Sequence, residues 1–413
     1  MSVAEPFRGQ SPDVIVVGAG VTGTSIAWRL AEAGKRVLVV EQRGVCSGAS
    51  GRNGGMTGAG SSMHASSRAG QAVYALTTAN LRLLKGLPDE LGTGFELRLP
   101  GTMDVITTEE QYAHLQAAVA IEREGGIDIE LIDGPAARSI MPALSPDVLG
   151  AAYAEDRGHL WPFALVNGMA DAAARNGAEI RTGATVERLA RRGERVTGVV
   201  VNGETILAEE TVLATNAWTP RLLPDLPAGA VVPARGQILV TQPLPPILAC
   251  PFGTNFDKEY GRQTPGGQLL CGGFRRLDVN EGLGTYLEEV TAPVQAGIAR
   301  CLTRLFPVLR GKARVVRSWS GIMGFTADGL PLVGRYDPAP GLTIAAGVNG
   351  GGFSWGAIVG KVIARLLNGE EVGFDLEPFR PSRFHDSDVT WQNPFTAGEK
   401  SNPREANTAA NMR

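Results

Sequence analysis

Residues 13–41 read DVIVVGAGVTGTSIAWRLAEAGKRVLVVE, two apolar runs on either side of a glycine-rich turn. Val14–Val17 and Val37–Val40 are too continuously apolar for surface strands, so both predict buried strands of a parallel sheet. Between them Ile26 and Leu30 recur at helical spacing. The stretch therefore predicts a strand–helix–strand unit of an α/β fold.

The turn after the first strand has the pattern GxGxxG, formed by Gly18, Gly20 and Gly23. The first glycine makes the turn, the second lets backbone amides approach a pyrophosphate, and the third lets the helix pack close to the strand. Glu41 ends the second strand, where a carboxylate can bind an adenosine ribose and disfavours the 2′-phosphate of NADP. The predicted dinucleotide contacts here are Gly18, Gly20, Val21, Thr22, Gly23, Glu41, Gln42 and Arg43.

The segments that follow distinguish FAD from NAD. NAD domains usually continue with regular strand–helix repeats, whereas here the glycine-rich stretch GASGRNGG, Gly48–Gly55, comes soon after Glu41. Its glycines let the backbone lie close against a flat or charged group. In VLATNAWTP the small residues Ala214 and Thr215 follow a buried strand, so the chain can cross beside the same cofactor. Both features favour FAD.

Two insertions divide the predicted nucleotide-binding domain. The first is charged and helical in pattern, and the second alternates like an antiparallel sheet, as in GQILVTQP and GGQLLCGGF. We therefore expect a discontinuous Rossmann-like FAD-binding domain with an inserted α+β substrate domain built on an antiparallel sheet. The expected FAD-binding domain covers 1–87, 149–227 and 319–385, the substrate domain 88–148 and 228–318, and a disordered tail 386–413.

The composition is that of an ordinary globular protein, with 43% apolar and 20% charged residues among 413. A formal net charge of −3 gives no electrostatic reason to expect nucleic acid or an anionic membrane as a partner. The first twelve residues lack the pattern of a signal peptide and no run of 18 apolar residues occurs, so we expect a cytoplasmic protein without a membrane span. No CxxC pair occurs, so neither a metal nor an iron–sulfur site is expected in this chain.

The chain resembles the D-amino-acid oxidase type of FAD-dependent amine oxidoreductases, which includes glycine oxidase, sarcosine oxidase and the catalytic subunits of bacterial opine and D-hydroxyproline dehydrogenases. Three segments, GHLWPF, RGQILVTQP and IMGFTADGLPLVG, are most similar to the opine and D-hydroxyproline subunits. The segments that carry the resemblance occur in the family's order: GAGVTG, VLVVEQ, SGASGRNGG, GHLWPF, VLATNAW, PARGQILVTQP, YGRQTPGGQLLCGG, RSWSGIMGFTADGLPLVG and GVNGGGFSWGAIVGKVIARLL.

This resemblance implies where the flavin ring would lie. The segment 50–56 would pass beside the isoalloxazine ring and the pyrophosphate, with Arg52 and Asn53 as donors, and the turn 347–353 would face the pyrimidine ring with its amides and a helix N-terminus. Asn53, Pro162 and Gly321 stand where some relatives carry a linking histidine or cysteine, so FAD is expected to be non-covalent. The further cofactor contacts implied are Ala49, Ser50, Gly54, Gly55, Met56, Val186, Ala214, Thr215, Trp218, Gly321, Gly350, Gly351, Gly352 and Phe353.

The resemblance also implies the chemistry. The family oxidises a C–N bond by moving the hydrogen on the carbon, formally as hydride, to flavin N5, and water then hydrolyses the imine. Orientation and a dry pocket matter more than a strong base in such a reaction. Carboxylate substrates usually require an arginine, which several relatives carry four residues after the tryptophan of a WxGxR pattern. Here Met323 stands in that place after Trp319, which disfavours glycine and simple D-amino acids.

Other cations could bind a substrate carboxylate instead. Arg262 follows Tyr260 on a strand that should face the pocket, and we also expect a contribution to the reaction from Met323 through its place in the pocket. Arg235 is expected to be structural, and His64 and His159 to be structural or surface residues. The open choices for the carboxylate are Arg52, Arg262, Arg275 and Arg276.

The electron acceptor is inferred from Leu270, which occupies the place of a lysine that assists reaction with O2 in sarcosine-oxidase relatives. We therefore expect a dehydrogenase for an opine, a D-hydroxyproline-like imino acid or an N-alkyl glycine. Its partner subunits would carry an iron–sulfur centre and a second flavin. The alternatives are a glycine- or sarcosine-type oxidase that produces H2O2, and a flavin-binding subunit with a structural or electron-relay role.

Overall fold

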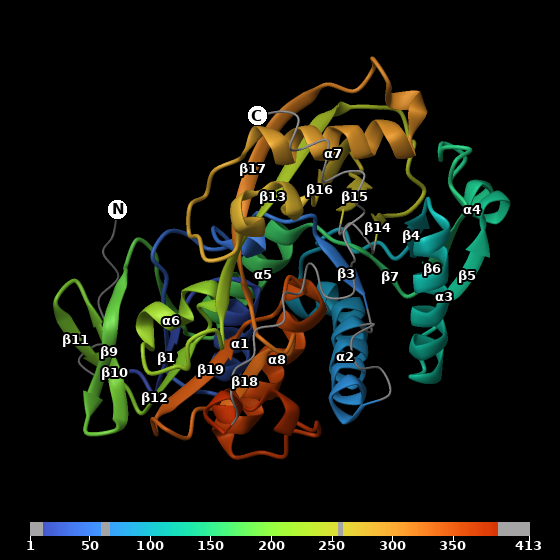
Figure 1. Ribbon diagram of the computed structural model, residues 1–413. Helices are drawn as coiled ribbons and strands as arrows, with labels where there is room; N and C mark the ends of the chain where they lie inside the picture. Colours follow the sequence, from blue (N-terminus) through green and yellow to red (C-terminus); the bar gives the residue numbers. More distant parts are fainter. Residues whose placement is uncertain (1–10, 59–66, 255–258, 387–413) are drawn as a thin grey trace.

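The computed structural model describes residues 11–58, 67–254 and 259–386 (Figure 1). His64 and, apart from Asp386, the expected disordered tail lie outside these ranges.

A six-stranded, mostly parallel sheet contains both strands of the opening stretch. Its neighbours pair in parallel from β19 to β8, and only β18 at one edge is antiparallel. In spatial order the strands are β18 (Leu332–Arg335), β19 (Leu342–Ala346), β12 (Glu210–Leu213), β1 (Val14–Val17), β2 (Val37–Val40) and β8 (Glu179–Arg181).

The strand β1 is apolar throughout because both faces of this sheet are covered. Val14 and Val16 belong to one buried cluster with the helices, whereas Ile15 and Val17 belong to another beneath a three-stranded antiparallel sheet. That second sheet consists of β9 (Val186–Arg192), β10 (Arg195–Val201) and β11 (Glu204–Leu207).

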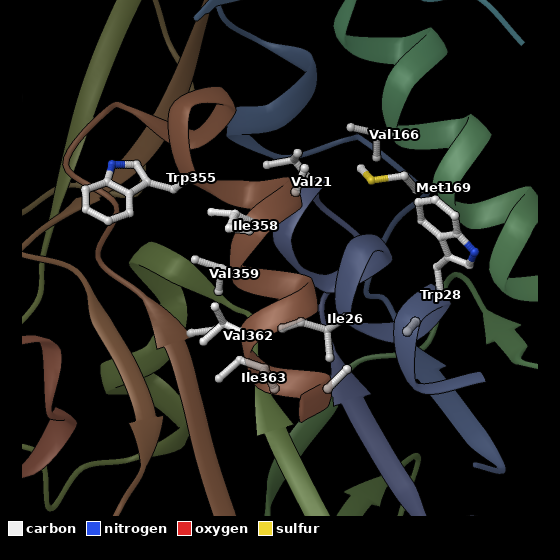
Figure 2. Close-up of a cluster of buried hydrophobic side chains, with 14 of the residues drawn as sticks. Val21, Ile26, Trp28, Val166, Met169, Trp355, Ile358, Val359, Val362 and Ile363 are labelled. Atoms are coloured by element: carbon white, nitrogen blue, oxygen red, sulfur yellow. The ribbon is translucent and has the colours of Figure 1, made fainter. Parts of the chain in front are cut away.

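The helix α1 (Val21–Glu32), which follows the GxGxxG turn, packs between α8 (Gly352–Asn368) and α5 (Pro162–Arg175), as Figure 2 shows. Ser25 donates a hydrogen bond of 2.9 Å to the carbonyl oxygen of Ala357, and α1 and α8 lie so close that a Cβ atom on Gly360 would come within 2.0 Å of Ser25 Oγ. This close packing places the N-termini of both helices side by side at one end of the sheet.

An eight-stranded sheet forms the other half of the molecule, with α7 (Ala292–Leu305) packed against it at the top of Figure 1. Its pairs are antiparallel except β14 with β4. In spatial order it consists of β17 (Val315–Phe325), β13 (Val232–Pro243), β16 (Gln268–Gly272), β15 (Glu259–Gln263), β14 (Phe252–Thr254), β4 (Thr102–Ile106), β6 (Gly150–Ala154) and β5 (Glu130–Asp133).

The structure of the first predicted insertion, residues 88–148, differs from the helical structure that its sequence pattern predicts. It contains the strands β4 and β5 as well as helices, because these short strands find their partners in β14 and β6, far away in the sequence. β6 and β17 also join this sheet although they lie wholly or partly in segments expected in the FAD-binding domain, so the exact domain boundaries stay a prediction.

The remaining regular elements are β3 (Met56–Gly58), β7 (Arg157–His159), α2 (Arg68–Leu91), α3 (Glu109–Glu124), α4 (Gly134–Ile140), α6 (Thr219–Leu222) and the 3-10 turns η2 (Ala49–Gly51), η3 (Asn216–Trp218), η4 (Arg275–Leu277), η5 (Val279–Gly282), η6 (Pro307–Leu309), η7 (Glu377–Phe379) and η8 (Pro381–His385).

Candidate functional site

A cavity of about 590 Å³ lies at the end of the parallel sheet where β1 meets α1. The GxGxxG turn forms one wall: Gly18 has φ +103°, and α1 begins directly after Gly20. Gly23 lies behind the turn, where a Cβ atom would come within 1.9 Å of the carbonyl oxygen of Gly18. The turn thus exposes the positive end of the α1 dipole to the cavity, as anion binding requires.

Glu41 lies in the same wall at the end of β2. Its carboxylate accepts hydrogen bonds of 2.9 Å from the backbone N–H groups of Ala19 and Arg43. These contacts fix the carboxylate between the glycine turn and the next segment of the chain. The arrangement fits the ribose-binding role that the sequence predicts.

The loop Gly48–Gly55 is closed by its own asparagine. The Asn53 amide donates to the carbonyl oxygens of Ala49 and Ser50, both at 2.7 Å, and its oxygen accepts from the N–H of Gly55 at 2.6 Å. Asn53 lines the cavity, yet both of its donor hydrogens serve the loop itself. Its predicted role as a donor to the cofactor is therefore replaced by a role in shaping the loop.

Arg52 points out of this loop rather than into the cavity. Its guanidinium donates to the carbonyl oxygen of Ser320 at 3.3 Å and pairs with Glu288 at 2.5 Å. A Cβ atom on Gly321 would come within 2.9 Å of the Cβ atom of Arg52, so the two predicted site residues pack against each other behind the wall. Arg52 is thus not among the cations that face a bound substrate.

Most of the predicted cofactor contacts line the cavity. The exceptions are Gly23, Arg52, Gly55, Gly321 and Gly351, which support the wall from behind. The predicted cofactor residues in the lining are Gly18, Gly20, Val21, Thr22, Glu41, Gln42, Arg43, Ala49, Ser50, Asn53, Gly54, Met56, Val186, Ala214, Thr215, Trp218, Gly350, Gly352 and Phe353.

The sequence interpretation missed Asn216, which also lines the cavity. Its side-chain oxygen accepts from the N–H of Gly347 at 3.0 Å, so it ties the segment after β12 to the glycine-rich turn before α8. Asn216 has φ +45°, a conformation that asparagine tolerates better than most residues. An asparagine directly after a buried strand was the signal that could have identified it.

The far end of the cavity is formed by Tyr260, Arg275, Met323 and Phe325. Burial raises the pKa of Tyr260 to about 12, so its hydroxyl stays protonated at neutral pH. Arg275 Nη2 lies 3.4 Å from the sulfur of Met323, and the guanidinium carbon lies 5.1 Å from the centre of the Phe325 ring. Arg275 therefore brings a cation next to Met323, the residue that the sequence led us to expect in the place of an arginine.

Arg275 remains a cation despite its surroundings. Burial lowers its pKa to about 10, while Tyr260, Asp278 and Glu281 act in the opposite direction. Arg276, another arginine considered from the sequence, is exposed and does not line the cavity. Arg235, which was expected to be structural, forms a buried bidentate pair with Asp278 at 2.7 and 2.8 Å. Arg275 is the candidate that the geometry favours.

Arg262 lies behind the cavity wall. It donates through Nε to the carbonyl oxygen of Gly54, and its Nη1 lies 3.3 Å from Nδ1 of His159. Both residues are buried. Arg262 therefore does not contact the cavity directly, in contrast to the role considered for it from the sequence, and His159 is structural as expected.

A segment that we call the strap, residues 283–291 between η5 and α7, contacts residues that line the cavity. Glu288 in the strap pairs with Arg43 at 2.8 Å and with Arg52 at 2.5 Å. The Tyr286 ring lies 5.8 Å from that of Trp218, a lining residue. The strap thus joins the inserted sheet to both sides of the cavity.

Among the described residues that line the cavity there is no histidine or cysteine, and within the same ranges no group of acidic, histidine or cysteine side chains could hold a metal ion. None of the described helices combines the length and apolar character that a bilayer span requires.

Comparisons with known proteins agree with this geometry. A family model described as "DAO: FAD dependent oxidoreductase" matches residues 13–366. The chain is similar to glycine oxidase of Geobacillus kaustophilus (31% identity, 90% of this chain and 97% of the relative) and to gamma-glutamylputrescine oxidoreductase of Escherichia coli (30%, 93% and 90%). It is also similar to an opine oxidase subunit of Rhizobium meliloti (26%, 90% and 97%).

The crystal structure of glycine oxidase from Geobacillus kaustophilus superimposes with a TM-score of 0.80 at 29% identity. It covers 90% of this chain, and this chain covers 98% of it. The similarity therefore extends over both sheets and the cavity between them.

Proposed function

The chain belongs to the DAO family of FAD-dependent oxidoreductases, and we propose that it is a dehydrogenase for a secondary-amine or D-type amino acid. Members of this family act on the C–N bonds of amines and amino acids. The proposed substrates are an opine, a D-hydroxyproline-like imino acid or an N-alkyl glycine. The family establishes an FAD-dependent oxidation of C–N bonds. What we propose is the substrate and the electron acceptor.

FAD supplies the acceptor for the hydride when it is bound. The residues present fit it: the α1 N-terminus and the glycine turn suit a pyrophosphate, and the fixed carboxylate of Glu41 suits a ribose. We propose that the loop Gly48–Gly55 and the turn 347–353 hold the ring system. We further propose that FAD is bound non-covalently, which is supported by the lack of a histidine or cysteine among the described lining residues.

The observation that carries the substrate class is the cation at the far end of the cavity. The Arg275 guanidinium can bind a carboxylate through two parallel hydrogen bonds, and the protonated Tyr260 hydroxyl can donate a third. The apolar Met323 and Phe325 beside them exclude water and strengthen these contacts. Together they would orient an amino acid by its carboxylate while its C–N bond faces the cofactor.

The substitution Arg275→Met tests this role. Because a hydrogen bond to a charged group contributes about 1.5–3 kcal/mol, we expect the KM for carboxylate substrates to rise roughly 10- to 100-fold. Arg276→Met is the matched control, since Arg276 is the exposed neighbour outside the lining. An equal KM in wild type and Arg275→Met, with full FAD content in both, would remove Arg275 from the substrate site.

The proposed acceptor is a partner chain. Leu270, which lies beside Gly54 of the cavity wall, carries no charge, and one relative is named as a subunit of an opine oxidase. By this proposal electrons leave through partner subunits that carry an iron–sulfur centre and a second flavin.

Anaerobic mixing of the holoenzyme with opines, D- and L-imino acids, sarcosine and glycine tests the whole assignment. Substrate is expected to bleach the flavin absorbance near 450 nm, and the bleaching is expected to persist when air is admitted. Rapid recolouring with formation of H2O2 would instead establish an oxidase. That second candidate is favoured by the 31% identity to a glycine oxidase.

A further inference from the structure

Three arginines are buried in the described part of the chain, and two of them have carboxylate partners. Arg29 pairs with Glu90 at 2.6 Å, and Arg235 pairs with Asp278 at 2.7 Å. Such pairing is the usual condition for burying a charge, because an unpaired ion loses its hydration without compensation. Arg262 is the exception.

Arg262 is 6% exposed, and both groups that bind it are formally neutral: the carbonyl oxygen of Gly54 and Nδ1 of His159. No carboxylate of the described residues lies within ion-pair distance of it, and Glu96 acts on it only from further away. Burial accordingly lowers the pKa of Arg262 to about 10, which still leaves a cation at neutral pH. Its positive charge is therefore held in place but not cancelled.

His159 is itself neutral, so it does not cancel the charge of Arg262. Burial, Arg262 and Arg98 lower the pKa of His159 to about 4, so the imidazole carries no charge at neutral pH. Arg262 Nη1 donates to Nδ1, which leaves the ring proton on Nε2. A carboxylate in the place of His159 would cancel the charge of Arg262, and the chain has a neutral acceptor there instead.

The charge lies directly behind the loop that forms the cavity wall. Gly54 lines the cavity and presents its carbonyl oxygen to Arg262 on the other side. Tyr260 and Leu270 contact the same glycine: a Cβ atom added to Gly54 would lie 3.1 and 3.6 Å from their side chains. Leu270 is also the residue opposite Arg262 in the pairing of β15 with β16. One hydrogen bond thus separates the guanidinium from the wall of the flavin cavity.

We propose that Arg262 is an electrostatic positioning residue for the redox reaction: its uncompensated charge raises the reduction potential of the bound flavin. Two-electron reduction builds negative charge on the ring system, and a fixed cation in a dry region stabilises that charge without reorganisation. The proposal requires FAD binding but neither the proposed substrate nor the proposed acceptor. A purely structural role, in which Arg262 only holds the Gly54 carbonyl, predicts different results.

The midpoint potential of the holoenzyme, measured by equilibration with a redox dye, separates the two roles. Arg262→Met removes the charge, and Arg262→Lys keeps the charge while losing the planar donor geometry. We expect Arg262→Met to lower the midpoint potential by at least about 30 mV, which for a two-electron couple lowers the ratio of reduced to oxidised flavin at a given potential at least tenfold. In Arg262→Lys this ratio should stay within threefold of the wild-type ratio. Equal shifts in both variants, or none in either, would overturn the proposal.

A second pair of variants leaves Arg262 in place. His159→Glu adds a counter-charge next to the guanidinium, whereas His159→Gln keeps a neutral acceptor of similar size. The midpoint potential should fall in His159→Glu and stay at the wild-type value in His159→Gln. This comparison holds even if the Arg262→Met variant does not retain FAD. Identical potentials in these two variants would also contradict the inference.

Arg52→Met is the matched control for charge. Arg52 belongs to the same loop, but it is paired with Glu288 and is 29% exposed, so water and the carboxylate screen it. We expect its removal to change the potential by less than a third of the Arg262→Met shift. A shift as large as that of Arg262→Met would mean that any arginine of the loop acts on the flavin, and the special role of Arg262 would be wrong.

Discussion

His159 is buried between Arg262 and Arg98, and this position couples its protonation to folding. Its pKa is about 4 in the folded chain, below the ordinary value of 6.5. Between these two values the unfolded chain binds a proton that the folded chain does not. The stability that depends on neutral His159 is therefore complete above pH 6.5 and is lost progressively as the pH falls from 6.5 to 4.

This linkage predicts a pH-dependent stability that one substitution removes. Between pH 7 and pH 4.5 the wild type should lose roughly 2–3 kcal/mol more of its unfolding free energy than His159→Gln, as urea unfolding at each pH would measure. His114→Gln, which replaces an exposed histidine of α3, should keep the wild-type dependence. If wild type and His159→Gln lose stability in parallel, the imidazole is not the group responsible.

Individual side chains also show where sequence reasoning reaches its limit. The structural role of Arg235 and the end-of-strand position of Glu41 follow from local pattern, and the structure places both accordingly. The direction of Arg52 and Arg262 does not, because each binds a carbonyl oxygen from a distant segment: Ser320 for one and Gly54 for the other. The residue type and its place on a strand predict that a cation lies near the site. They do not predict which oxygen accepts the hydrogen bonds of the guanidinium group.

At the scale of elements, the strap connects the inserted sheet to the cofactor cavity. Glu288 bridges Arg43, just after β2, and Arg52, in the loop Gly48–Gly55. Tyr286 adds a hydrogen bond of 2.9 Å to the carbonyl oxygen of Ala217 beside the lining residue Trp218. FAD that leaves the cavity on this side has to displace contacts that the strap makes on both walls.

The substitution Glu288→Gln tests the strap. Partly exposed ion pairs contribute about 0.2–1 kcal/mol each, so losing two of them should speed FAD release by roughly 2- to 10-fold. The recovery of free FAD fluorescence after dilution measures the rate. Glu289→Gln changes the charge of the exposed neighbour and should leave the rate unchanged. Equal release rates in Glu288→Gln and wild type would show that the strap does not retain the cofactor.

Regular elements with strong local patterns were predicted correctly, and short strands with distant partners were not. β1, α1 and β2 occur where the apolar spacing predicts them, and α8 begins at the glycine-rich turn, as the resemblance implies. β4 lies in a stretch interpreted as helical because its only partners, β6 and β14, come later in the chain. Pairing of this kind has no local signal.

The whole molecule brings four separate stretches of the chain around one cavity. The lining comes from residues 17–56, 184–222, 260–275 and 323–353, so both the parallel sheet and the eight-stranded sheet contribute. A ligand that binds such a cavity contacts the folded chain only. It must therefore stabilise the fold as a unit.

Removal of FAD should lower the melting temperature of the protein, and FAD added back should restore it. At a free FAD concentration of 100 times Kd the expected stabilisation is about 2.7 kcal/mol, which differential scanning calorimetry would detect. NADP is the control ligand, because the carboxylate of Glu41 repels its 2′-phosphate, and it should produce no shift. A melting temperature that is the same with and without FAD would mean that the two sheets are not coupled through the cavity.

The sequence by itself determined the nucleotide-binding unit, because glycine spacing, apolar period and the carboxylate at Glu41 are local features with direct physical meaning. The glycine-rich stretch after Glu41 favoured FAD, and the family followed from the resemblance of several segments in order. The tertiary structure decided which of the arginines considered for the substrate carboxylate lines the cavity. Arg52, Arg262 and Arg275 are alike in sequence, but only folding shows that Arg52 pairs with Glu288, that Arg262 lies behind Gly54 and that Arg275 lines the cavity. The reason is that a side chain's charge acts through the groups packed around it, and those groups come from segments that are hundreds of residues apart.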